Sequence, residues 1–262
     1  MGFFFLNIYL NMNRIFDILK KDDRPYDTIY NLYLNGEIKT IFPELYNLHT
    51  DDEGYKNNFI HTLGVLKNVC DADYDYKMKL VAIFHDIGKS VTKKYTEKGW
   101  TFHHHEVIGA RMARLILQDW GVYNTDLGDY VYRMILHHGR TKVHRDITES
   151  AIRRLDAEVG PDIIFDLINF CKCDLTTKFD DKRGRINSAL DIIKQRIIEV
   201  RAKDEDAKWR SPLTGHMVME LLGMGEGRIV GEIKKELDPK LKSGEITLDD
   251  AIKYIKSKWL KN

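Results

Sequence analysis

The 262-residue sequence predicts an all-α fold. Apolar side chains recur every three or four residues along successive segments, as Phe59, Leu63 and Leu66 do between Lys56 and Cys70. Several such segments end at a glycine, a residue that is enriched just after helix C-termini. The sequence shows no convincing strand pattern, no internal repeat and no low-complexity tract. These observations favour a bundle of helices whose apolar faces form the core.

The expected helices follow one another along the chain. They cover residues 15–20, 28–34, 56–70, 77–87, 106–120, 126–138, 150–159, 161–174, 187–202, 214–222, a segment ending near 241 and a last one from 247. Gly88 is expected to stop the 77–87 helix, and Pro161 to occupy the first position of the 161–174 helix. Thr247 and Asp250 have the spacing of a capping box. Residues 97–100 are expected to form a polar turn or a small hairpin.

The composition indicates an ordinary globular protein. Hydrophobic residues make up 43% of the chain, enough for a sizeable core, and 41 basic residues nearly balance 40 acidic ones. A broad basic surface for nucleic acid is therefore not indicated, although a local patch is compatible with these numbers. Apolar periodicity lapses at 177–185, which suggests a boundary. We expect an N-terminal helical segment at 1–50, a central domain at 51–180 and a C-terminal helical region at 181–262.

The cysteines and the N-terminus favour a cytoplasmic protein without a membrane partner. Cys70, Cys171 and Cys173 cannot form a disulfide framework and are expected to be reduced thiols. No stretch approaches the 18 or so consecutive apolar residues of a membrane span. Residues 1–11 are apolar but lack the basic region and cleavage site of a signal peptide. They are either an upstream extension of the reading frame or a packed terminal segment.

The dipeptide His85-Asp86 is the strongest candidate for a functional site. It follows the apolar run Leu80–Phe84 and places an imidazole beside a carboxylate near a helix end. This pair suits Mn, Fe, Co, Ni or Zn and, with more oxygen ligands, Mg. Because the dipeptide is common by chance, its meaning depends on further ligands in the chain.

Further candidate ligands cluster in the same half of the chain, where eight of the ten histidines lie between His61 and His144. Each candidate lies near a helix end or in a buried helix; they are His61, His85, Asp86, His105, His137, His138 and Asp174. Alone, each has an ordinary explanation, such as a core histidine, a helix-capping cation or a surface charge. Together they indicate that several helices point ligands at one metal centre.

The order His61, His85-Asp86, Asp174 resembles the HD superfamily of metal-dependent phosphohydrolases, through the motifs Asn58-Phe-Ile-His-Thr62 and Ile83-Phe-His-Asp-Ile-Gly-Lys89. Four further motifs resemble the HD-containing half of bacterial CCA-adding enzymes over roughly residues 38–258. They are Ile41-Phe-Pro-Glu-Leu45, Phe102-His-His-His-Glu-Val-Ile-Gly-Ala110, Ile152-Arg-Arg-Leu155 and Pro212-Leu-Thr-Gly-His-Met-Val-Met-Glu-Leu-Leu-Gly223. The nucleotidyltransferase head of those enzymes has no counterpart here, so the resemblance implies phosphohydrolase activity and leaves nucleotide addition in doubt.

The resemblance also implies a ligand set. His61, His85, Asp86 and Asp174 would form the minimal metal set, and His105 with His137 or His138 would hold a second ion in two-metal members. The choice between one ion and two stays open, and the family spacing slightly favours His138 over His137.

The expected reaction is hydrolysis of a phosphate ester by a metal-activated water. Asp86 would be both a ligand and a proton acceptor. Lys89 would neutralise phosphate charge, and Arg153 and Arg154 would add a bidentate clamp. The alternatives are a helix-capping role for Lys89 and a solvated helix face for the arginines.

The resemblance implies substrates at RNA ends, with tRNA or another RNA as a partner. The expected activity is of the 2′,3′-cyclic phosphodiesterase, 2′-nucleotidase or phosphatase type. The alternative functions are an HD 5′-nucleotidase acting on free nucleotides and a non-catalytic RNA-binding module.

Overall fold

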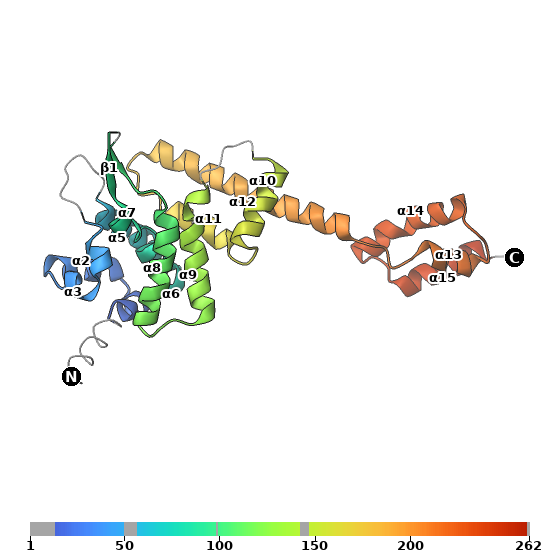
Figure 1. The fold of residues 1–262 in the computed structure, drawn as a ribbon. Coiled ribbons are helices and arrows are strands. Elements are labelled where there is room, and N and C mark those ends of the chain that lie inside the picture. Colours follow the sequence, from blue (N-terminus) through green and yellow to red (C-terminus); the bar gives the residue numbers. More distant parts are fainter. Residues whose placement is uncertain (1–13, 50–56, 98, 142–146, 261–262) are drawn as a thin grey trace. The chain divides into compact units, whose positions relative to one another are not determined.

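The computed structural model describes residues 14–49, 57–97, 99–141 and 147–260. Within these ranges the regular structure is helical apart from one two-stranded hairpin, which confirms the all-α prediction and the small hairpin (Figure 1). The expectation for residues 1–11 lies outside the described residues. Within the same ranges, no helix combines the length and apolar character needed to span a membrane.

The chain divides into two compact units, residues 1–198 and 199–262. The division falls inside one long helix, α12 (Asp180–Lys208). The expected boundary at 180/181 coincides with the start of this helix instead. The three-part division of the sequence stays a prediction.

The first unit contains residues 14–21, which are helical, and then most of the labelled elements. Before the hairpin come α2 (Pro25–Leu34), α3 (Ile38–Ile41), α4 (Pro43–Tyr46), α5 (Asn58–Asp71), α6 (Tyr76–Phe84) and α7 (Lys89–Thr92). The hairpin consists of β1 (Lys94–Thr96) and β2 (Gly99–Thr101), paired antiparallel. After it come α8 (His105–Asp119), α9 (Thr125–His137), the 3₁₀ helix η1 (His138–Thr141), α10 (Glu149–Val159) and α11 (Ile164–Cys173).

Helix α6 forms the centre of the first unit. All five residues from Leu80 to Phe84 are completely buried, and α6 packs against α5, α8 and α9. The ring of Phe84 packs 5.8 Å from that of Phe42 and 5.5 Å from that of Trp120, measured between centroids. This aromatic core fixes the C-terminal end of α6, where His85 and Asp86 follow.

Side-chain caps explain where several helices begin. The Asn57 side chain accepts a hydrogen bond from the backbone of Ile60 at the start of α5, and Asp75 caps α6 in the same way. Asn124 and Thr148 cap α9 and α10. These short polar side chains satisfy backbone N–H groups that have no partner in the first turn of a helix.

Three expected boundaries are wrong. Helix α6 ends at Phe84 rather than at residue 87, because the backbone tightens to i→i+3 hydrogen bonds from Ile87 to Phe84 and from Lys89 to Asp86. Residues 161–163 form a turn, so α11 begins at Ile164 and not at Pro161. The long helix α12 begins at Asp180 rather than at residue 187, so it includes most of the polar segment 178–185.

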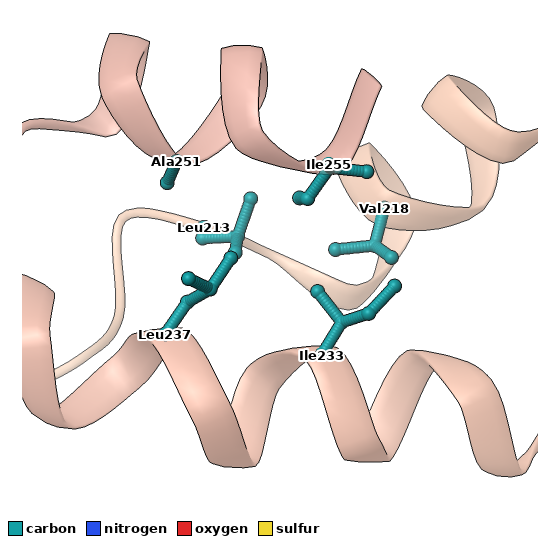
Figure 2. Close-up of a cluster of buried hydrophobic side chains, with 6 residues drawn as sticks. All are labelled: Leu213, Val218, Ile233, Leu237, Ala251 and Ile255. Carbon is teal, nitrogen blue, oxygen red and sulfur yellow. The ribbon is translucent and has the colours of Figure 1, made fainter. Parts of the chain in front are cut away.

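The second unit forms a small bundle after the last turns of α12. It contains α13 (Gly215–Leu222), α14 (Arg228–Ser243) and α15 (Leu248–Trp259). Figure 2 shows the core, in which side chains of α14 and α15 face each other across Leu213 and Val218. The core residues are Leu213, Val218, Ile233, Leu237, Ala251 and Ile255. Thr247 and Asp250 form the expected capping box at the start of α15.

Candidate metal centre and cleft

His85 and Asp86 lie in the turn that follows α6, and both are buried, with 0% and 2% of their surfaces exposed. The Nδ1 atom of His85 lies 2.8 Å from the carbonyl oxygen of Ala82. A carbonyl oxygen can only accept a hydrogen bond, so Nδ1 carries the proton and Nε2 keeps its lone pair. That lone pair faces the candidate centre.

His61 comes from α5 and is 7% exposed. Its Nε2 lies 3.3 Å from Nε2 of His85 and 2.9 Å from Oδ1 of Asp174, which follows α11. Its Nδ1 lies 2.8 Å from Oγ1 of Thr176. Because the Thr176 hydroxyl can accept the Nδ1 proton, it allows the lone pair of His61 to face the same centre. The sequence did not single out Thr176.

A first group of ligand atoms therefore forms around His61, His85, Asp86 and Asp174. Oδ2 of Asp86 lies 3.3 Å from Nε2 of His85 and 3.7 Å from Nε2 of His61. Oδ1 of Asp174 lies 3.5 Å from Nε2 of His85. The structure brings together the whole minimal set implied by the family resemblance.

A second group of ligand atoms uses the other oxygen of Asp86. Oδ1 of Asp86 lies 3.5 Å from Nε2 of His105, at the start of α8, and 3.8 Å from Nε2 of His138, at the start of η1. The Nδ1 atoms of these histidines lie 2.9 Å and 2.7 Å from the carbonyl oxygens of Phe102 and Ile135. Both rings thus turn Nε2 lone pairs toward Asp86, as His85 does.

The donor set fits a divalent transition metal. Imidazole lone pairs and carboxylate oxygens converge from helices far apart in sequence, and carbonyl oxygens hold three of the rings in one tautomer. Among the described residues, Asp174 Oδ1 is buried and has no hydrogen-bond donor. This oxygen lies 2.9 Å from Nε2 of His61, which donates no hydrogen in the neutral tautomer that directs its Nδ1 proton at Thr176. A cation would satisfy this oxygen and the lone pairs around it.

Electrostatics keep the carboxylates ionised. Burial acts to raise the pKa of Asp86, but the neighbouring His85 and the charge of Lys89 outweigh it, and the pKa lies well below its ordinary value. The pKa of Asp174 is lowered as well, because its contact with His61 and the charge of His85 outweigh burial.

Two of the histidines are kept neutral. Burial, together with the charge of His85, lowers the pKa of His138 to about 4. Burial likewise lowers the pKa of His105. Neutral imidazole is the form that binds a metal. For His85, the carboxylates of Asp86 and Asp174 outweigh burial and raise the pKa.

A cleft of about 220 Å³ opens onto both groups. It is lined by His61, Asp86, Lys89, His105, Glu106, His138, Gly139 and Asp174. Nζ of Lys89 lies 2.7 Å from Oδ2 of Asp86, at the cleft wall. Glu106 was not predicted as a site residue, although its position next to His105 at the start of a helix could have drawn attention to it. Its Oε2 lies 3.2 Å from Nδ1 of His105.

The start of α8 lies unusually close to the turn after Asp86. A Cβ atom on Gly88 would lie 2.2 Å from the carbonyl oxygen of His105 and 2.7 Å from the backbone nitrogen of Gly109. Only glycine permits this approach. The contact brings His105 within reach of Asp86 and so builds the second group.

Three predicted site residues lie elsewhere. His137 is 8% exposed, but it contributes to neither group, and its Nδ1 has no hydrogen-bond partner among the described residues. Arg153 pairs with Glu149 at 3.3 Å. Arg154 lines a separate cavity of about 170 Å³ with Arg140, Ile147, Ala151, Leu155 and Glu158. The structure therefore does not bring the proposed arginine clamp to the cleft.

Comparison with protein families identifies the domain. Residues 58–163 match the family model of the HD domain, a range that includes His61, His85, Asp86, His105 and His138 but ends before Asp174. Over these residues the chain is similar to the HD domain, a class of helical domain whose members are in general metal-dependent hydrolases. A comparison with curated proteins finds no match.

Proposed function

We propose that the chain is a metal-dependent phosphohydrolase that acts on phosphate esters of nucleotides or of RNA ends. The observation that carries this proposal is the position of Asp86, whose two carboxylate oxygens face different pairs of imidazoles. A buried ion pair would need only one cation beside the carboxylate. Four imidazoles around Asp86 are more than such a pair requires.

In this proposal two ions bind, one at each group of ligand atoms. His61, His85, Asp86 and Asp174 would hold the first, and Asp86, His105 and His138 the second. A divalent cation at such a site lowers the pKa of a water molecule and stabilises negative charge on a phosphoryl group. The protein itself orients the ligands. The carbonyl oxygens of Ala82, Phe102 and Ile135 fix the orientations of the His85, His105 and His138 rings before any ion binds.

Lys89 and Glu106 line the cleft beside these ligands. The Lys89 ammonium lies close enough to Asp86 to neutralise a phosphate oxygen there as a point charge. Asp86 stays a candidate proton acceptor as well as a ligand, but both of its oxygens already face imidazoles. Glu106 can take that role, since a carboxylate at the cleft wall can accept the proton of the attacking water.

The substrate class rests on the sequence motifs shared with the HD-containing half of CCA-adding enzymes, which point to 2′,3′-cyclic phosphates, 2′-phosphates and other phosphomonoesters. The size of the cleft is compatible with this class. At about 220 Å³ it is smaller than the ~300–1,000 Å³ of pockets that enclose whole drug-sized ligands. A phosphate and part of its sugar would enter the cleft, and the base would stay outside.

A hydrolysis assay that separates the nucleotide products and also measures free phosphate tests the proposal, because opening a 2′,3′-cyclic phosphate gives a 2′- or 3′-phosphate and releases no free phosphate. Metal-stripped protein receives Mn, Co, Ni, Mg or Zn separately and is offered 2′,3′-cyclic AMP, 2′-AMP, 3′-AMP and 5′-dAMP. Turnover of the cyclic or 2′ compounds supports an RNA-end phosphohydrolase. Turnover of 5′-dAMP alone would instead identify a 5′-nucleotidase. Inactivity with every metal would overturn the proposal and favour a non-catalytic RNA-binding module.

A further inference from the structure

We propose that one face of the β1–β2 hairpin stacks the bases of a single-stranded nucleic acid whose phosphate end lies in the cleft. The placement of that phosphate end rests on the proposed function. In the sequence, the hairpin lies directly between α7, which begins with Lys89, and α8, which begins with His105. It therefore connects two elements that both contribute to the cleft.

The face is defined by the hairpin register. Tyr95 and Trp100 are direct cross-strand partners, so their side chains lie on the same face. Their ring centroids are 5.0 Å apart, in an edge-to-face arrangement. Phe102 follows two residues after Trp100, just past the end of β2. Tyr95 is 67% exposed, so its ring surface is available to a ligand.

Cations accompany these rings. Nζ of Lys93 lies 4.1 Å from the centroid of Trp100, and Nζ of Lys89 lies 5.7 Å from that of Phe102. The sequence from 93 to 102 contains Lys93, Lys94 and a third lysine against a single acidic residue, Glu97. Aromatic rings for the bases, combined with positive charge for the backbone, are what sequence-tolerant single-strand binding uses.

The face is continuous with the metal centre. The Phe102 carbonyl oxygen orients His105, and the Phe102 ring lies next to Lys89, which contacts Asp86. At about 3.3 Å per residue in an extended chain, Trp100 lies roughly 7 Å beyond Phe102. Bases that the cleft is too small to hold would therefore meet an aromatic surface next to it.

These features favour nucleic acid over a protein partner. A stable protein interface buries about 800 Å² on each side and is depleted of lysine at its centre. The hairpin face and the adjoining Phe102 instead offer three rings with lysines beside two of them. That pattern matches a charged strand with stacking bases.

The test measures binding and turnover separately. Fluorescence anisotropy gives the Kd of the full chain for fluorescein-labelled pentaadenylate with a free 3′-hydroxyl, which has no terminal phosphate to release. Tyr95→Ala is expected to raise Kd about tenfold, since stacking contributes ~1–3 kcal/mol per base. Tyr95→Phe keeps the ring and should stay within about twofold of wild type by the same reasoning. Tyr30→Ala, on α2, removes an exposed tyrosine that is 40% accessible and serves as the matched control.

Turnover gives the second readout. It compares kcat/KM for two substrates, a pentanucleotide ending in a 2′,3′-cyclic phosphate and 2′,3′-cyclic AMP. We expect Tyr95→Ala to lower the ratio of the first value to the second by the same factor of about ten. The hairpin proposal is overturned if wild type fails to bind the labelled pentaadenylate, or binds it no more tightly than Tyr95→Ala does. This holds even if both substrates are hydrolysed. Tyr95-dependent binding without any hydrolysis would support the hairpin and overturn the phosphohydrolase.

Discussion

The Nε2 atoms of His61 and His85 lie 3.3 Å apart, and both face Asp86 and Asp174. In the neutral form of His85, with its proton on Nδ1, Nε2 has no hydrogen to donate. Two lone pairs at this distance, beside two ionised carboxylates, form an arrangement that a cation stabilises. The packed core around α6 holds the four groups in place without an ion.

Divalent metal should therefore stabilise the folded chain. At a free metal concentration one hundred times Kd, the free energy of unfolding should rise by about 2.7 kcal/mol. Urea unfolding with Mn or Ni, compared with EDTA, measures the change. In His61→Ala the metal-dependent increase should be largely lost. An equal increase in that variant would show that the metal binds elsewhere.

His138 and His137 should differ in metal binding although they are neighbours. Of these two histidines, only His138 directs a ring nitrogen at Asp86. His138→Ala should remove one equivalent of bound ion, whereas His137→Ala should keep the wild-type content. Elemental analysis of protein dialysed against limiting metal gives both numbers. The opposite pattern would overturn the assignment of the second group.

The neutral form of His138 predicts a pH effect on the metal-free protein. Burial lowers the pKa of His138 from 6.5 to about 4, so the unfolded chain binds its proton first as the pH falls. The contribution of neutral His138 to the free energy of unfolding is complete above pH 6.5 and is lost between pH 6.5 and 4. The loss is on the order of 3 kcal/mol.

Urea unfolding in EDTA at pH 7 and pH 5 tests this effect. His138→Gln should lose less stability than wild type over the interval, because the buried titrating ring is gone. Parallel pH profiles for the two proteins would contradict the shift.

Glu106→Gln should separate catalysis from metal binding. If Glu106 accepts the proton of the attacking water, kcat should fall by ~10²–10⁴-fold. Metal content should stay at the wild-type level, because Glu106 belongs to neither ligand group. Unchanged kcat would remove Glu106 from the mechanism, and lost metal would make it a ligand instead.

Local patterns were enough for much of the fold and for part of the site. The apolar period gave the helices, and His85-Asp86 stood out because an imidazole and a carboxylate follow a buried run. The start of the long helix was expected at residue 187 rather than at Asp180, because the polar segment after residue 177 lacks apolar periodicity. Asp180 and Asp181 in the first turn of α12 are the acidic residues that favour a helix N-terminus.

The orientation of side chains required the tertiary structure. Consecutive helical residues point ~100° apart, so the rotation of α9 and η1 decides between His137 and His138. The same holds for Arg153 and Arg154, which the packing of α10 turns away from the cleft. Glu106 and Thr176 act through contacts with His105 and His61, which only the folded chain reveals.

The most direct test of the metal centre is a metal-binding titration of wild type and Asp86→Asn. Asparagine keeps the shape of the side chain but removes the charge that both ligand groups share. Circular dichroism serves as the control for folding. The structure predicts tight binding of divalent metal by wild type, with weakened binding at both groups and no substrate hydrolysis in Asp86→Asn. Full metal content and turnover in that variant would contradict the account.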